Sequence, residues 1–214
     1  MKTDALIAML AQGPVAVRPR AVGRRLLSAT AIGVALASVV MLATLHLRAD
    51  LATAVHAPMF WLKLAVPLAI AALAVVAVRR LACPGGSAGP AVAVGAVLLV
   101  VLAAAAVANV VIAPASERAA LVLGKTALPC VALVAALSLP TLVAIFIALR
   151  SLAPTRLTAA GAAAGALAGG LGAAVYAWHC NEMTLPFVAV WYVLGMAIPL
   201  GLGALLGRRW LHWS

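Results

Sequence analysis

The sequence has little charge and very few acidic residues. Of its 214 residues, 9% are charged, and Asp and Glu together number 4. This is too little charge to cover a water-facing surface of this size or to sustain a long disordered tail. Cysteines number three and form no CxxC pair. The chain therefore lacks the spacing of a zinc ribbon and of a thioredoxin-type motif.

The chain is instead rich in apolar residues. Hydrophobic residues make up 67% of it, well above the roughly 45–50% of soluble domains, and the mean hydropathy is +1.21. A soluble globular protein is excluded. The 15 Lys and Arg residues stand singly or in pairs between apolar runs, whereas a nucleic-acid-binding protein gathers them on one solvent face. We therefore expect the lipid bilayer, and no direct contact with nucleic acid.

Six apolar runs are long enough to cross a hydrocarbon core of ~30 Å as helices. They are Leu26–Leu47, Met59–Val78, Ala91–Ala113, Thr126–Leu149, Leu157–Trp178 and Leu185–Leu206. Short segments with turn residues join them, so no loop can hold a separate domain. We predict an all-α polytopic membrane protein with an N-terminal tail (1–25), a six-helix transmembrane domain (26–207) and a C-terminal tail (208–214).

The basic residues predict the orientation, because Lys and Arg near span ends are retained in the cytoplasm. With the N-terminus inside, 11 of the 15 basic residues fall on the cytoplasmic side. The other four are Arg48, Lys63, Arg118 and Lys125. Both termini are therefore predicted to be cytoplasmic.

Lys63 is the one charged residue inside a predicted span, four residues from its start. Its long stem can carry the ammonium to the outer interface by snorkelling. Alternatively, it pairs with Asp50 or Glu182 at the outer rim, or forms a step in an ion path. No Asp, Glu or His lies deep in any span, which weighs against an ion-coupled transporter.

The fifth predicted span carries Gly161, Gly165 and Gly169 at intervals of four residues. This spacing leaves one helix face bare, so that another helix can approach closely. In a six-span bundle such a face more often packs internally than between subunits. We favour internal packing and keep a homodimer as the alternative.

The N-terminal tail contains one short candidate helix. Thr3 and Asp4 suit a helix N-terminus, and Leu6, Ile7 and Leu10 form an apolar stripe. A helix of about ten residues is marginal in water and needs a surface to fold on. With one Lys and no aromatic residue, it fits a groove of a cytoplasmic protein at least as well as a lipid surface.

The predicted outer side gathers side chains that bind soft metals. Cys130 lies about one turn inside the fourth span, and His179, Cys180 and Met183 follow the fifth, while Cys83 lies on the opposite side. Three interpretations of Cys130 and Cys180 remain open: a structural disulfide or buried thiols, a redox-reactive pair, and ligands of a soft ion such as Cu(I), with His179 and Met183 completing the set.

Several short motifs follow one another along the whole chain. They are Met1-Lys2-Thr3-Asp4-Ala5-Leu6-Ile7, Phe60-x-x-Lys63, the lone Cys130, Ala153-Pro154-Thr155-Arg156, Trp178-His179-Cys180 and Trp191-Tyr192-x-Leu194-Gly195. Each is unspecific alone, but their order and spacing resemble the NrsF family of bacterial anti-sigma factors.

The resemblance implies a six-span protein of the bacterial inner membrane that is not an enzyme. It implies that the cytoplasmic N-terminus holds an extracytoplasmic-function (ECF) sigma factor inactive and releases it on heavy-metal or oxidative stress. It also implies that Cys130 and Cys180 are the sensing pair, whereas Cys83 has no counterpart. The tail is too short for the larger zinc-type anti-sigma domains, and no HxxxCxxC occurs.

Two other classes of function remain as alternatives. An intramembrane thiol oxidoreductase needs a quinone site and usually a CxxC motif. A small-solute transporter needs a polar path through the spans. The sequence displays neither feature.

Overall fold

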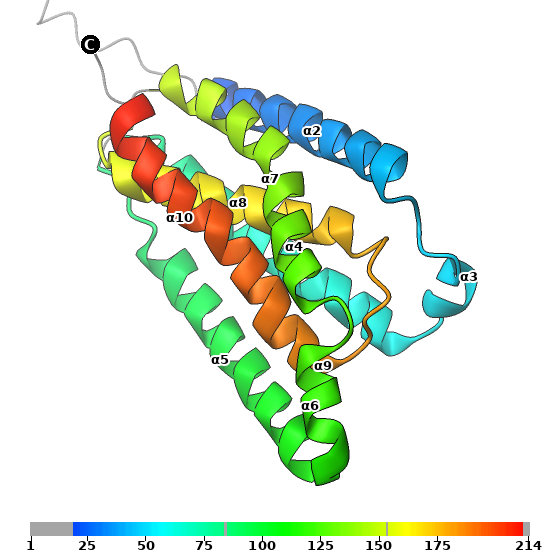
Figure 1. The fold of residues 1–214 in the computed structure, drawn as a ribbon. Helices are drawn as coiled ribbons and strands as arrows, with labels where there is room; N and C mark the ends of the chain where they lie inside the picture. Colours follow the sequence, from blue (N-terminus) through cyan, green and yellow to red (C-terminus); the bar gives the residue numbers. More distant parts are fainter. Residues whose placement is uncertain (1–18, 84, 153, 212–214) are drawn as a thin grey trace, which may run out of the picture.

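A computed structural model describes residues 19–83, 85–152 and 154–211, and this part of the chain is helical and contains no strand. Its elements in chain order are α2 (Pro19–Thr44), α3 (Leu51–Ala54), α4 (Pro58–Leu81), α5 (Gly89–Ile112), α6 (Ala115–Leu123), α7 (Ala127–Arg150), α8 (Leu157–Tyr176), α9 (Leu185–Phe187), the π-helical turn η1 (Val188–Tyr192) and α10 (Val193–Trp210) (Figure 1). The candidate helix Thr3–Leu10 lies outside the described residues.

Six helical segments in the described residues are long and apolar enough to cross a membrane. This confirms the all-α class and the six predicted spans. The fourth segment joins α6 to α7, and the sixth joins α9, η1 and α10. The cytoplasmic placement of both termini stays a prediction.

The predicted end of the first span is wrong, because the helix ends earlier in the sequence. α2 stops at Thr44 rather than Leu47, because His46 adopts a left-handed conformation with φ of 60°. The N–H of His46 donates a hydrogen bond to the carbonyl of Met41 at 3.1 Å. Histidine tolerates this conformation better than most residues with a side chain. The carbonyl of Met41 is therefore satisfied at the end of α2, and the chain turns toward α3.

Helix α8 is the centre of the bundle and contacts α2, α4, α7 and α10. Its glycines permit this packing, because a Cβ at Gly161 or Gly165 would overlap the carbonyl oxygen of Gly203 or Pro199 on α10. The predicted glycine face therefore packs internally. Since α10 covers it, this face is not available to a second chain.

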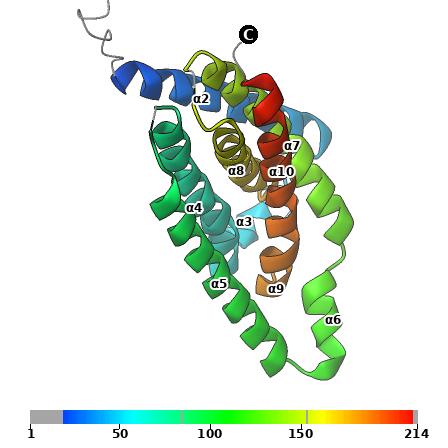
Figure 2. The ribbon, with the colours of Figure 1, turned by 90° about the vertical axis from the view of Figure 1, so that its left-hand side faces the viewer.

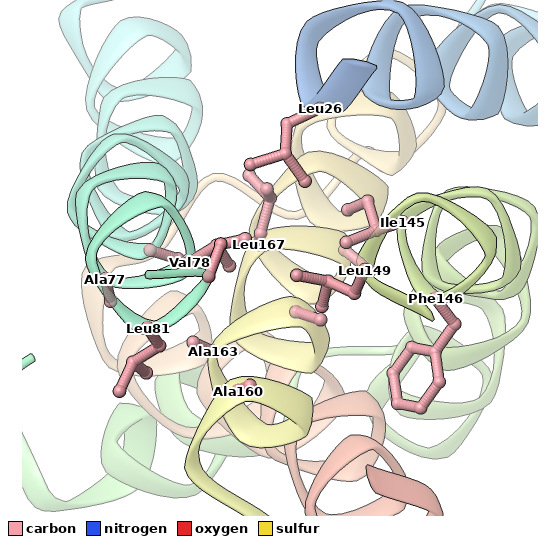
Figure 3. Close-up of a cluster of buried hydrophobic side chains, with 14 of the residues drawn as sticks. Leu26, Ala77, Val78, Leu81, Ile145, Phe146, Leu149, Ala160, Ala163 and Leu167 are labelled. Carbon is pink, nitrogen blue, oxygen red and sulfur yellow. The ribbon is translucent and has the colours of Figure 1, made fainter. Parts of the chain in front are cut away.

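Apolar side chains from α2, α4, α7 and α8 meet in one buried cluster (Figure 3). Its members include Leu26, Val78, Leu149 and Leu167. Lipid tails are as apolar as these side chains, so close van der Waals packing holds the helices together more than transfer out of water does.

Helices α5 and α6 lie at the edge of the molecule (Figure 2). The buried residues of α5 are Ala91, Leu102 and Ala106, and α6 buries none. The segment between the third and fourth predicted spans was expected to be a plain connection. It contains the nine-residue helix α6, which the six-span pattern missed because this stretch is short and carries Glu117 and Arg118.

Candidate functional site

The loop between α8 and α9, residues 177–184, is the polar centre of one end of the bundle. Its start continues the turn of α8, with the N–H of Cys180 bonded to the carbonyl of Tyr176 at 3.1 Å. Its end is set by α9, which has a proline in its first turn. The loop lies near α3 and the start of α4 on the right of Figure 1. Three other segments of the chain bind to it.

Lys63 of α4 makes the first of these connections and is fully buried. Its Nζ donates to the carbonyl oxygens of Cys180 at 2.5 Å and Glu182 at 2.9 Å. It also lies 5.8 Å from the centre of the Tyr192 ring, within the range of a cation–π contact.

These contacts correct the expectation that Lys63 pairs with a carboxylate. The ammonium is buried, and its contact with Glu182 is made to the main chain. Snorkelling of Lys63 to the membrane interface stays a prediction. Among the described residues the ion pair is formed by Arg48 and Asp50, not by Lys63. Backbone carbonyls therefore replace both water and a carboxylate as partners of this charge.

Arg48, in the connection between α2 and α3, makes the second connection and is also buried, with 6% of its surface exposed. Its Nε and Nη2 donate to the two carboxylate oxygens of Asp50 at 2.6 and 2.7 Å. The hydrogen bond from Arg48 lowers the pKa of Asp50, and the same bond raises the pKa of Arg48. The remaining nitrogen, Nη1, reaches the carbonyl of Cys180 at 3.2 Å and Sδ of Met183 at 3.4 Å.

The carbonyl of Cys180 thus accepts hydrogen bonds from two cations, Arg48 and Lys63. Two further bonds join the connection after α2 to the same loop. The N–H of Arg48 donates to the carbonyl of Trp178 at 3.2 Å, and His179 Nδ1 lies 3.0 Å from the carbonyl of His46. The end of α2 and the start of α4 are therefore both attached to the backbone around Cys180.

Glu182 makes the third connection, to the turn before α7. Its Oε1 accepts the N–H of Lys125 at 2.7 Å and the hydroxyl of Thr126 at 3.2 Å. Gly124 in that turn has a φ of 55°, and an added Cβ would strike Phe187 and Glu182. Only glycine fits this turn without strain. Glu182 thereby fixes the start of α7, where Cys130 lies one turn further on.

Cys130 and Cys180 lie in one buried cluster with Tyr176, Phe187 and Tyr192. Cys130 has no exposed surface and Cys180 has 3%, while Cys83 is exposed. All three thiols are free. The structure thus brings together the two cysteines that were expected to share one side of the membrane.

The hydroxyl of Tyr192 adds a polar atom to this cluster. It is buried, and among the described residues it has no hydrogen-bond partner. Tyr192 closes the π-helical turn η1. Such turns are rare and occur frequently at functional sites. The cluster is therefore polar in four places, at the two thiols and at the hydroxyls of Tyr176 and Tyr192, although apolar side chains surround it.

His179 and Met183 have partners other than the thiols. His179 contacts the carbonyl of His46, and Met183 contacts Arg48. Within the described ranges, no three His, Cys, Asp or Glu side chains lie close enough to share a metal ion. The cluster as folded offers two thiols, which suit a soft ion such as Cu(I) better than a hard one.

The predicted partner contacts Thr3, Asp4, Leu6, Ile7 and Leu10 lie outside the described residues. The sequence analysis missed the carbonyl partners of Lys63, the attachment of Arg48 to the Cys180 carbonyl and the role of Glu182. One signal was present, because Lys63 is the one charge within a span and lies close in sequence to Phe60 and Trp61. Carbonyl partners more than 100 residues away leave no sequence pattern.

The fold and this site define a class, a six-span helical membrane protein with its buried charged side chains, Arg48 and Lys63, at one end of the bundle. A family described as "Negative regulator of sigma F" (NrsF) matches residues 10–213, and the chain belongs to that family. This confirms the resemblance. The family consists of regulators rather than enzymes, which agrees with the expected absence of catalysis.

Two relatives match over the full length of both chains. The chain is 43% identical over 215 residues to "Probable anti-sigma-F factor NrsF" of Azospira oryzae. It is 37% identical over 215 residues to "Anti-sigma-F factor NrsF" of Caulobacter vibrioides. No solved structure matches the chain.

Proposed function

We propose that this chain is an anti-sigma factor of the bacterial inner membrane that holds an ECF sigma factor at its cytoplasmic face. The names of the two full-length relatives support the anti-sigma role. The apolar stripe Leu6, Ile7 and Leu10, with Thr3 and Asp4 at the helix start, supplies the contact. Such a stripe binds an apolar groove of a partner, on which the short helix folds.

We further propose that Cys130 and Cys180 receive the signal. The observation that carries this proposal is their burial in one cluster at the loop that holds Arg48 and Lys63. Disulfide formation releases two protons and gives two electrons to an oxidant, whereas capture of a soft ion such as Cd²⁺ or Cu(I) releases the two protons alone. Either reaction draws Cys130 and Cys180 into a new geometry.

A shift of Cys180 reaches both α2 and α4, because its carbonyl is bonded to Arg48 and Lys63. The far end of α2 leads into the N-terminal tail. In this proposal α2 has two arrangements that orient the N-terminal tail differently. The two arrangements bind the sigma factor with different affinities. A coupling free energy of about 1–3 kcal/mol changes that affinity roughly 5- to 150-fold.

The test is the output of the sigma-dependent genes under cadmium, copper or dichromate exposure in single variants. Cys130→Ser and Cys180→Ser should abolish the response, and Cys83→Ser is the matched control that should respond normally. A normal response in Cys180→Ser would contradict the sensing role. His179→Ala removes the contact with the carbonyl of His46, so it should weaken the response to every inducer. Diamide, which oxidises thiols and supplies no metal, separates the two chemistries, because it should induce the genes only if a disulfide forms.

The anti-sigma contact has a separate test. Ile7→Asp places a charge on the apolar stripe, where its desolvation costs several kcal/mol. The regulated genes should then be expressed without stress at normal membrane levels of the protein. Continued repression would show that the stripe is not the contact.

A further inference from the structure

A groove of about 540 Å³ lies between α2 and α4, at the end of the bundle opposite the 177–184 loop. Its walls are apolar, and they include Leu26 and Leu27 of α2, Val75 and Val78 of α4, and Leu167 of α8. Figure 3 shows Leu26, Val78 and Leu167 near one another where α2, α4 and α8 meet. The volume is in the range of sites that hold a small molecule, roughly 300–1,000 Å³.

Two arginines also line this groove, Arg24 on α2 and Arg79 on α4. Both side chains are exposed. The guanidinium of Arg79 extends toward α2, because a Cβ added at Gly23 would lie 3.9 Å from its Nη2. Within the described ranges neither arginine forms an ion pair. An apolar groove that carries two cations is complementary to a molecule with an anionic head and a hydrocarbon tail.

We propose that this groove binds one anionic phospholipid, with its phosphate on Arg24 and Arg79 and an acyl chain along the apolar walls. Guanidinium groups bind phosphate oxygens through paired hydrogen bonds. Basic pockets between transmembrane helices bind anionic lipid headgroups.

The charge of the chain's own N-terminal segment makes it a poor occupant. Residues 1–18 contain Lys2 and Arg18 and a single acid, Asp4, so their net positive charge is repelled by the two arginines. A bound lipid lies between α2 and α4 and fills the space that separates them. It therefore stabilises one arrangement of these two helices, whichever partner the N-terminal tail binds.

The test uses the full-length protein, purified in detergent and titrated with phosphatidylglycerol. Phosphatidylcholine with the same acyl chains and glycerol 3-phosphate form the other two arms. Native mass spectrometry counts bound lipid, and the unfolding temperature reports stabilisation. Phosphatidylglycerol should bind as one tight equivalent and raise the unfolding temperature more than either comparison compound.

The double variant Arg24→Gln/Arg79→Gln should bind phosphatidylglycerol about 30-fold more weakly, since each basic residue near an anionic headgroup contributes a factor of about five. Arg208→Gln/Arg209→Gln removes two arginines that do not line the groove and should bind normally. Val75→Trp keeps both arginines and narrows the acyl path, so it should also weaken binding.

Three outcomes would overturn the proposal. Equal binding of phosphatidylcholine and phosphatidylglycerol would show that the arginines do not select a headgroup. Equal stabilisation by glycerol 3-phosphate would indicate a site for free phosphate. Unchanged phosphatidylglycerol binding in the Arg24→Gln/Arg79→Gln variant would place the lipid elsewhere.

Discussion

At the scale of single residues, the unusual feature is a peptide carbonyl that two buried cations share. A charge inside a membrane is costly unless polar groups replace its water. For Lys63 these groups are the carbonyls of Cys180 and Glu182 and the ring of Tyr192. Arg48 is bonded to the carbonyl of Cys180 and also to the carboxylate of Asp50. The charge of Lys63 is therefore satisfied only while the 177–184 loop keeps its position, whereas Arg48 also has the carboxylate of Asp50.

Lys63→Met should loosen this loop and expose the two buried thiols. A hydrogen bond to a charged group contributes about 1.5–3 kcal/mol, so the open population should rise roughly 10- to 150-fold. The measurement is the rate of maleimide labelling of Cys130 and Cys180 in a Cys83→Ser background. Lys125→Met makes the same charge change at an exposed side chain and should label at the original rate. Equal rates in the two variants would contradict the role given to Lys63.

The pair of Arg48 and Asp50 predicts a dependence of stability on pH. The hydrogen bond from Arg48 lowers the pKa of Asp50 below its ordinary value of 3.8. A carboxyl with a lowered pKa in the folded state stabilises that state above its unfolded pKa and loses this effect as pH falls through the folded pKa. The unfolding temperature of the wild type should therefore exceed that of Asp50→Asn at neutral pH.

This difference should persist down to about pH 4 and shrink only below it. A difference that already disappears between pH 7 and 5 would indicate that another group, such as a histidine, controls the loop.

At the scale of helices, α8 and α10 pack very closely. Backbone meets backbone there, since Gly161 and Gly165 lie against Gly203 and Pro199. Small residues at such a crossing permit the close van der Waals packing that stabilises membrane helices. The same approach makes the crossing intolerant of even one added methyl group.

Gly165→Ala should lower the stability of the bundle by about 1–3 kcal/mol, because its Cβ overlaps the backbone of α10 and the helices must separate. Gly201→Ala on α10 is the matched control, since nothing lies within 4 Å of its added Cβ. The control should be neutral or slightly stabilising, as alanine favours helix over glycine by about 1 kcal/mol. The measurement is the unfolding temperature of each variant in detergent. An equal fall in unfolding temperature in both variants would contradict the packing described.

The sequence predicts the spans well because a single property, the length of an uncharged apolar run, decides them. It also predicts that the glycines of α8 pack internally, since their spacing places them on one face. It does not predict α6 or η1, which depend on contacts such as that of Trp191 Nε1 with the carbonyl of Val122 at 2.7 Å. The two cysteines were predicted to share one side, but their attachment to Arg48 and Lys63 depends on the folded loop.

At the scale of the whole molecule, the bundle has two different ends. One end holds the 177–184 loop with its thiols and cations, and the other holds the start of α2, the end of α10 and the groove with Arg24 and Arg79. Helices α2 and α4 run between them; α2 contacts α7 and α8 on the way, and α4 contacts α8. A signal at the thiols therefore has a structural route to the tail that precedes α2.

The basic residues predict that the end with the start of α2 and the end of α10 faces the cytoplasm. A reporter active only in the periplasm, fused after Ser214, should be silent, and the same reporter inserted in the connection between α5 and α6 should be active. Activity after Ser214 would reverse the orientation and place the thiols in the reducing cytoplasm, where a stable disulfide does not form.

The central claim is that reaction of Cys130 and Cys180 releases the sigma factor. The most direct measurement takes membranes that contain the Cys83→Ser chain with its sigma factor bound. The membranes are treated with diamide or cadmium. The number of free thiols per chain and the amount of sigma factor still bound are then measured in the same samples. We predict that sigma factor is lost in step with the two thiols, and that a chain also carrying Cys180→Ser retains it. Full retention after both thiols have reacted would contradict the claim, as would equal release from the Cys180→Ser chain.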